Sequence, residues 1–284
     1  MKKLITAVVS LGLMIGTASA GTDVGADIKA FQGYFKKQNP SVEFADYTIG
    51  VYALDAGSRD QFEEILDGIP PYEEAVEKGG EEFEKFGLGK CSALKDPAAA
   101  RLAHPYYDDA AGTVVTLEGT IRRCYTEQTG KKMGTMKGKI ARISSWISDQ
   151  AAGEKINVKV ESDGAKAAYE RGKATFYAKR GQFNMSCADC HVYNAGKKAR
   201  ADILSPALGH TSHVPMYRAK WGGIGTLHRR YGGCYKNMRA KPLMAQSSEY
   251  RDMEFFHQAM SNGIEISADR YRKQRCNTRL FLQY

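Results

Sequence analysis

The sequence predicts a mainly helical protein made of two similar domains, and three observations favour this fold class. A segment in the second half of the chain repeats one in the first half at a separation of 110 residues. Apolar residues follow a helical period over residues 164–180, just before a compact Cys-x-x-Cys-His motif. The chain of 284 residues is also long enough for two ordinary domains, which we place at 21–157 and 158–284.

The first twenty residues have the pattern of a secretory signal peptide. Lys2 and Lys3 form a basic start, an apolar run extends from Leu4 to Gly16, and the small residues 18–20 form a cleavage site. The apolar run is too short to span a bilayer, and no later segment reaches transmembrane length. We therefore expect a periplasmic protein with signal peptide 1–20 and no membrane span.

The two halves of the exported chain differ in charge. Residues 21–156 carry a net charge of −5 and residues 157–284 one of +12. This asymmetry favours an anionic partner or substrate for the second half, with an ordinary solvated basic surface as the alternative. Nucleic acid is not an expected partner, because the protein is exported.

Residues 187–191 read Cys-Ala-Asp-Cys-His and match the attachment motif for a c-type haem. Cys187 and Cys190 lie one helical turn apart, so each thiol can bond a haem vinyl group, and His191 then projects its imidazole toward the iron. A redox Cys-x-x-Cys pair or half of a zinc site is the competing interpretation. The adjacent histidine and the lack of a second Cys-x-x-Cys argue against both. We expect one covalent haem c per chain.

The repeat continues on both sides of its cysteine. The region upstream, Gly119–Ile121, resembles Gly225–Leu227 if a short insertion is allowed before the second cysteine. We also expect short strands at 113–117 and 156–160. The pairs at a separation of 110 are Cys124 and Cys234, Tyr125 and Tyr235, Lys131 and Lys241, Trp146 and Phe256, Gly153 and Gly263, and Ile156 and Ile266.

The repeat also predicts that the first domain is a cytochrome-c-like domain that has lost its haem. Residues 91–95, Cys-Ser-Ala-Leu-Lys, align with the haem motif, so a leucine and a lysine replace the second cysteine and the histidine. The remaining Cys91 and Cys124 would lie on opposite sides of the vacated site. In an oxidising compartment we expect them to form a disulfide rather than two separate buried thiols.

By the same correspondence, Cys234 faces the haem of the second domain as a distal iron ligand. Arg229 and Arg230 lie close enough in sequence to stabilise its thiolate, and Gly232 and Gly233 would allow a close approach of the backbone. Methionine is the more common distal ligand in small cytochromes c. The alternatives in this half are Met238, Met244, Met260, His210, His213, His228 and His257.

Over nearly its whole mature length the chain resembles SoxA, the larger subunit of the SoxAX cytochromes. The resemblance is carried by the haem motif at 187–191, by Arg230–Tyr235 (Arg-Tyr-Gly-Gly-Cys-Tyr) and by a degenerate first domain with Cys91 and Cys124. Many SoxA proteins carry two haems. This chain has a single Cys-x-x-Cys-His motif and resembles the single-haem branch, in which a disulfide replaces the first haem.

The resemblance implies an enzyme, an L-cysteine S-thiosulfotransferase that joins thiosulfate oxidatively to a cysteine of the sulfur carrier SoxYZ. It implies a heterodimer with SoxX, a small cytochrome c subunit that receives the electrons. His191 would be the proximal ligand, Cys234 a distal ligand that can carry a persulfide, and Arg230 a catalytic residue over the site. The alternatives are a periplasmic electron-transfer cytochrome c without its own substrate and a structural subunit that recruits an enzyme. Cys276 has no assigned role.

Overall fold

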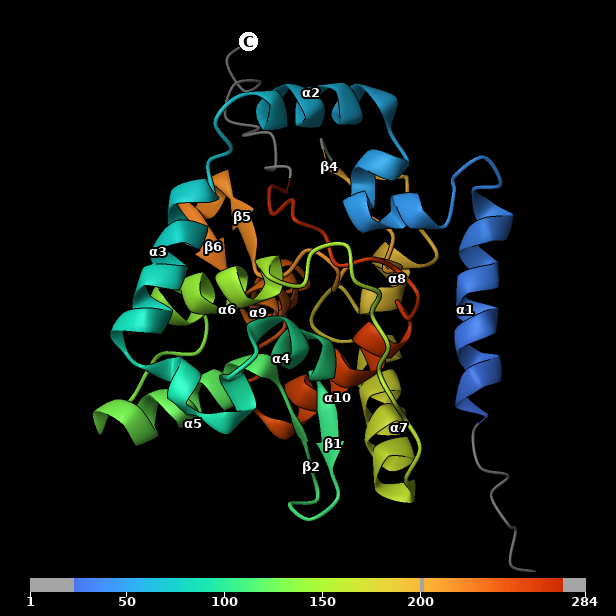
Figure 1. Ribbon diagram of the computed structural model, residues 1–284. Coiled ribbons are helices and arrows are strands. Elements are labelled where there is room, and N and C mark those ends of the chain that lie inside the picture. Colours follow the sequence, from blue (N-terminus) through green and yellow to red (C-terminus); the bar gives the residue numbers. More distant parts are fainter. Residues whose placement is uncertain (1–22, 200–201, 273–284) are drawn as a thin grey trace, which may run out of the picture.

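The computed structural model describes residues 23–199 and 202–272 (Figure 1). The predicted signal peptide 1–20 and Cys276 lie outside these residues. The described part is mainly helical, which confirms the predicted class, and contains only short strands. Within the same residues, no helix is both long and apolar enough to cross a membrane.

The two halves of the chain contain similar elements in a similar order, with a short antiparallel hairpin before the last two helices of each half. The first half contains α1 (Val24–Gln38), α2 (Ala56–Asp67), α3 (Glu73–Lys85), α4 (Pro97–Ala103), β1 (Tyr106–Asp108), β2 (Thr113–Val115), α5 (Leu117–Thr129) and α6 (Lys139–Asp149). The second half contains α7 (Asp163–Tyr177), α8 (Cys187–His191), β3 (Lys198–Ala199), β4 (Asp202–Ile203), β5 (Met216–Arg218), β6 (Gly223–Gly225), α9 (Leu227–Asn237) and α10 (Ser248–Ala259).

Two of the local expectations can be compared directly with these elements. The predicted helix over 164–180 is α7, and the predicted strand at 113–117 is β2. The predicted strand at 156–160 is wrong. Residue Val158 instead bonds a side chain, because its N–H donates to Asn262 Oδ1 at 2.8 Å.

Side chains at the helix ends explain where several helices begin. Thr116, Ser162 and Ser247 each accept a hydrogen bond from the backbone N–H three residues later, which caps α5, α7 and α10. The capping residues correct the upstream part of the repeat, because Thr226 is the N-cap of α9. Thr116, rather than Thr120, therefore corresponds to Thr226, and the separation of 110 residues holds there without an insertion.

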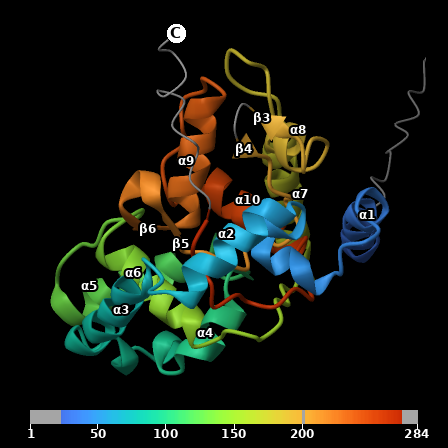
Figure 2. The same cartoon turned by 90° about the horizontal axis from the view of Figure 1, so that it is seen from above.

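In each half, one pair of helices crosses at a glycine. A Cβ atom on Gly79 of α3 would lie 2.1 Å from the carbonyl oxygen of Arg142 on α6. A Cβ atom on Gly172 of α7 would lie 2.0 Å from the carbonyl oxygen of Asp252 on α10. The two carbonyl residues are themselves 110 positions apart. Figures 1 and 2 show α3 beside α6 and α7 beside α10.

The loops that follow α6 and α10 bond to each other reciprocally. The Gly153 N–H donates to the Ile266 carbonyl at 2.9 Å, and the Gly263 N–H donates to the Ile156 carbonyl at 2.8 Å. Each bond becomes the other when 110 is added to one residue number and subtracted from the other. The two halves therefore meet here through equivalent segments, as at a local twofold axis.

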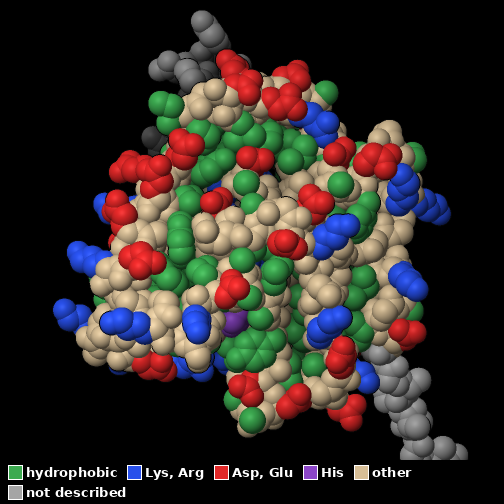
Figure 3. Space-filling model, viewed as in Figure 1, with side chains coloured by type: hydrophobic (Ala, Val, Ile, Leu, Met, Phe, Trp, Pro, Cys, Tyr) green, Lys and Arg blue, Asp and Glu red, His purple; other side chains and the backbone are tan. Residues whose placement is uncertain are grey.

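Helix α1 packs against the second half of the chain. The Gln32 side chain donates to the carbonyl oxygens of Met260 and Asn262 at 3.2 and 2.9 Å. Lys173 of α7 forms an ion pair with Asp27 at 2.8 Å. In the view of Figure 3, acidic side chains gather over α2 and α3, in agreement with the negative charge of the first half.

Candidate functional site

Helix α8 holds the two cysteines of the Cys-x-x-Cys-His motif one turn apart. A reciprocal cap begins this helix: the Asp189 N–H donates to Ser186 Oγ at 3.0 Å, and the Ser186 N–H donates to Asp189 Oδ2 at 2.8 Å. The Ala188 side chain between the cysteines is fully buried. The cap and this buried contact fix the turn on which Cys187 and Cys190 lie.

The His191 ring is oriented by its Nδ1 atom. Nδ1–H donates to the backbone carbonyl oxygen of Ser205 at 2.8 Å, which leaves the Nε2 lone pair available as a ligand. Metal-bound histidines are commonly held in this way by a second hydrogen bond. Sequence reasoning missed Ser205, because no spacing rule links it to a motif fourteen residues earlier.

A polar network continues behind His191. The ring of His210 lies 4.6 Å from that of His191, and its Nε2 lies 2.6 Å from Ser205 Oγ. The next ring is that of His257, 5.3 Å from His210, and its Nδ1 lies 3.0 Å from the Tyr231 hydroxyl. These histidines therefore lie on the His191 side of the site and have partners within the protein.

The Cys234 thiol of α9 lies against His191, close enough for a side-chain hydrogen bond. Burial raises the pKa of Cys234, but Arg230, His191 and Arg218 lower it, and the pKa falls to about 7. Much of this sulfur is therefore thiolate at neutral pH. The sequence correctly singled out Cys234 and Arg230 as neighbours, whereas Arg218 lies in β5 and belongs to no motif.

The two cysteines of α8 differ from Cys234 in their electrostatic environment. Burial raises the pKa of Cys187 to about 12, and burial together with the Cys234 charge raises the pKa of Cys190. All three sulfurs are free thiols that influence one another. The protein thus separates two neutral thiols suited to covalent attachment from one anionic sulfur suited to ligation or reaction.

The alternative distal ligands on the sequence list lie in other environments. Met244 is 80% exposed. Met260 is buried, with its sulfur 3.9 Å from the Tyr169 hydroxyl. His228 Nδ1 accepts a hydrogen bond from the Gln246 N–H at 2.9 Å. None of these three side chains is among the groups that act most strongly on Cys234.

Two smaller expectations about the Cys234 segment are corrected. Arg229 was expected to help stabilise the thiolate, but its guanidinium lies 4.3 Å from the centre of the Trp221 ring. A Cβ atom on Gly232 or Gly233 would make only ordinary contacts, at 3.8 Å or more. Among protein atoms these glycines therefore leave space beside Cys234 instead of bringing backbones together.

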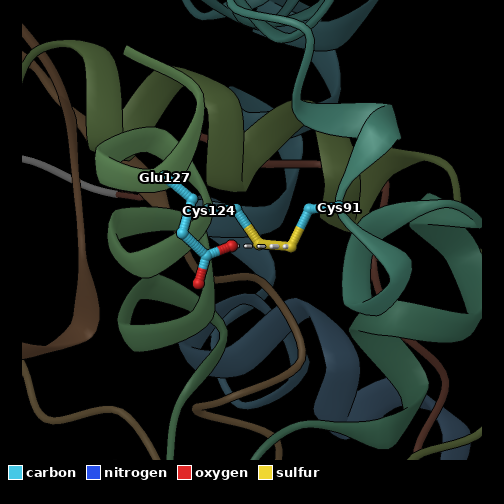
Figure 4. A group of neighbouring side chains, drawn as sticks. All are labelled: Cys91, Cys124 and Glu127. Carbon is cyan, nitrogen blue, oxygen red and sulfur yellow. Dashed lines mark hydrogen bonds between the residues drawn. A yellow bond between two sulfur atoms is a disulfide. The ribbon is translucent and has the colours of Figure 1, made fainter. Parts of the chain in front are cut away.

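In the first half, Cys91 and Cys124 are joined by a disulfide with an S–S distance of 1.99 Å (Figure 4). Cys124 lies on α5, and Cys91 lies between two short 3₁₀ helices. Glu127 Oε2 lies 3.8 Å from Cys91 Sγ. A disulfide sulfur carries no proton, so this contact places a negative charge beside the bond without donating a hydrogen bond.

The side chains of the second half fit a covalently attached haem. Two thiols on one helical turn, an imidazole with a free Nε2 and a soft sulfur facing that imidazole are the groups that such a cofactor needs. A cavity of about 200 Å³ elsewhere lies between α1 and α7, and it is lined by none of these four residues.

Comparison with known proteins agrees with this arrangement. The model of the SoxA/TsdA cytochrome c domain matches residues 171–266. The chain is 50% identical over 253 residues to the L-cysteine S-thiosulfotransferase subunit SoxA of Chlorobaculum thiosulfatiphilum, covering 88% of each chain. It is 38% identical over 266 residues to the SoxA subunit of Allochromatium vinosum, covering 92% of this chain and 94% of that one.

A solved structure is also similar. The crystal structure of SoxXA from P. pantotrophus matches with a TM-score of 0.66 and 28% sequence identity, over 75% of this chain and 84% of that chain. The cytochrome c domain implies a c-type haem as the cofactor. From its similarity to these relatives over most of their length, we conclude that the chain belongs to the SoxA family, the subunits of the sulfur-transferring enzyme L-cysteine S-thiosulfotransferase.

Proposed function

We propose that this protein catalyses the oxidative conjugation of thiosulfate to a cysteine of the SoxYZ sulfur carrier, in the periplasm and as a heterodimer with a SoxX-like cytochrome c. The observation that carries the proposal is the Cys234 thiol, which faces His191 and lies under the influence of Arg230. A cytochrome that only transfers electrons has no need of a reactive anionic sulfur beside its iron ligand.

We assign one haem c to each chain, bonded to Cys187 and Cys190. His191 Nε2 would be the proximal ligand and the Cys234 sulfur the distal one. When bound, the haem supplies a redox centre next to the reacting sulfur. The mass of the exported protein is expected to show one haem adduct, and two adducts or none would contradict this assignment.

The overall reaction converts the carrier thiol and thiosulfate into an S-thiosulfonated carrier, one proton and two electrons. In our proposal the Cys234 sulfur, or its persulfide, bonds to the sulfane sulfur of thiosulfate, and the two electrons pass to the partner cytochrome. The carrier thiolate then attacks that sulfane sulfur and displaces the Cys234 sulfur. Arg230 binds the sulfonate oxygens by charge-assisted hydrogen bonds throughout.

We also propose that the two halves arose by duplication and that the first half has lost its haem, with domains at 21–157 and 158–284. The glycine crossings in α3–α6 and α7–α10 and the reciprocal hydrogen bonds at residues 153–156 and 263–266 support the duplication. The Cys91–Cys124 disulfide lies where the haem cysteine and Cys234 lie in the second half, which supports the loss.

The test of this function is a Cys234→Met variant, assayed for thiosulfate-dependent conjugation with SoxX and SoxYZ present. Haem attachment should persist, because the α8 residues are unchanged, and the visible spectrum should change. Conjugation should fall roughly 10³-fold or more, as expected when a reacting nucleophile is removed.

Arg230→Ala should also impair conjugation while haem attachment persists, and Arg230→Lys should recover only part of the loss. Lysine keeps the charge but cannot form two parallel hydrogen bonds. If Cys234→Met retains full conjugation in this assay, Cys234 has no covalent role and the electron-transfer alternative replaces our proposal.

A further inference from the structure

We propose that Arg218 is a second anion-binding residue of the Cys234 site, which holds the sulfonate end of a doubly charged thiosulfonate-type substrate together with Arg230. The inference rests on the proposed function, because it concerns the substrate of the same site. It adds a residue that no motif indicates and a reason for the site to prefer a dianion.

The hairpin β5–β6 carries Arg218 to this site. Arg218 is the last residue of β5 and pairs with Gly223 of β6. Strand β6 ends at Gly225, and α9 begins two residues later with Thr226 as its N-cap. Arg230 and Cys234 then follow one turn apart on α9. The short connection therefore fixes the strand residue relative to the two helix residues.

The charges around Arg218 identify what it faces. Burial and Arg230 lower the pKa of Arg218, Cys234 and Asp202 raise it, and the pKa is about 10. The guanidinium is therefore charged at neutral pH although it lies beside another one. In turn, Arg218 is one of the three side chains that lower the pKa of Cys234. These relations place Arg218, Arg230 and Cys234 in one cluster.

Neither guanidinium of this cluster is used up by the protein. Over residues 23–199 and 202–272, the side chains of Arg218 and Arg230 form no ion pair with a carboxylate and donate no hydrogen bond. Each guanidinium has five N–H donors in a planar fork that matches an oxyanion. Both forks lie beside a sulfur that is itself anionic, so an oxyanion that binds there can direct a sulfur atom toward Cys234.

The Trp221 ring holds Arg218 in place. The Arg218 guanidinium lies 5.7 Å from the centre of that ring, and the Arg229 guanidinium lies 4.3 Å from it. Gly225 makes room for this packing, because a Cβ atom there would lie 2.6 Å from Arg229 Cδ and 2.7 Å from Trp221. Arg229 thus shares the ring with Arg218 but is not among the strongest influences on Cys234.

The reaction gives the second cation a specific use. Thiosulfate enters with two negative charges, whereas the S-thiosulfonate group on the carrier leaves with one. Two guanidinium groups bind the dianion more strongly than the product monoanion. Arg218 therefore favours substrate binding over retention of the product, and it takes no part in the bond changes at sulfur.

The experiment compares Arg218→Ala and Arg218→Lys with Arg229→Ala, each in the full haem-loaded chain with its partner cytochrome. Loss of charge-assisted hydrogen bonds to the sulfonate should raise the KM for thiosulfate by about 10- to 100-fold in Arg218→Ala, with kcat changed less than about 3-fold. Arg218→Lys should recover part of this loss. Arg229→Ala, which removes an arginine from the same ring, should change KM by less than about 3-fold.

Direct binding keeps the test independent of turnover. Titration calorimetry would compare thiosulfate with methanethiosulfonate, a monoanion that keeps the same terminal sulfur. Wild type should prefer thiosulfate, and Arg218→Ala should lose that preference while its haem spectrum and melting temperature stay unchanged. An unchanged preference in Arg218→Ala, or an equal loss in Arg229→Ala, overturns the assignment. If wild type binds thiosulfate with this preference but does not conjugate it, the proposed function fails and the role of Arg218 in binding remains.

Discussion

The crossing of α7 and α10 predicts that Gly172→Ala destabilises the haem-bearing half. An alanine Cβ would lie 2.0 Å from the Asp252 carbonyl oxygen and 2.8 Å from Phe256 Cβ, far inside van der Waals contact. The two helices must separate to admit the methyl group. Overpacking of this kind costs about 1–3 kcal/mol. For a chain of this length, that free energy lowers the melting temperature by roughly 2–12 °C.

The matched control is Gly33→Ala in the middle of α1. A Cβ atom at Gly33 meets nothing within 4 Å, so the substitution removes only the conformational freedom of glycine. It should stabilise the protein by about 0.5–1 kcal/mol. The same chemical change is thus expected to have opposite signs at the two sites.

Thermal unfolding of the haem-loaded chain, followed by circular dichroism, measures both variants. Gly79→Ala provides a third measurement, because its Cβ would lie 2.1 Å from the Arg142 carbonyl oxygen in the first half. It should behave like Gly172→Ala. If Gly172→Ala melts at or above the temperature of Gly33→Ala, the helices are not held at the distance described and the packing argument is refuted.

Two predictions concern the first half of the chain. Glu127 lies beside the Cys91–Cys124 disulfide and repels anionic nucleophiles, so Glu127→Gln should speed cleavage by sulfite roughly 5-fold, the effect of about 1 kcal/mol between charges 4 Å apart in water. Peptide mapping after timed alkylation measures this, and equal acceleration by an uncharged phosphine would count against an electrostatic cause. Burial lowers the pKa of His104, whose Nε2 lies 2.8 Å from Thr120 Oγ1. The unfolded chain therefore takes up this proton first, and stability falls below about pH 6.5 by up to about 1.4 kcal/mol per pH unit. Urea unfolding of His104→Asn should show a shallower pH dependence between pH 6.5 and 5, and an identical slope would disprove the contribution.

The sequence by itself determined the features that depend on spacing along the chain. Cys187, Cys190 and His191 must be close in sequence, because one helical turn has to present both thiols and the imidazole. The separation of 110 residues linked Cys124 to Cys234, and Cys91 aligned with the haem motif. These patterns predicted a helical fold and the cysteine pair that the structure joins.

Only the tertiary structure decided which distant residues complete the site. Ser205 reaches His191 and Arg218 reaches Cys234 through loops and a hairpin, and such contacts leave no periodic trace in the sequence. Arg229 shows the converse error, because its neighbour on α9 faces the sulfur while its own side chain packs on Trp221. Adjacent helical residues point about 100° apart, so proximity in sequence could not assign both arginines to one site.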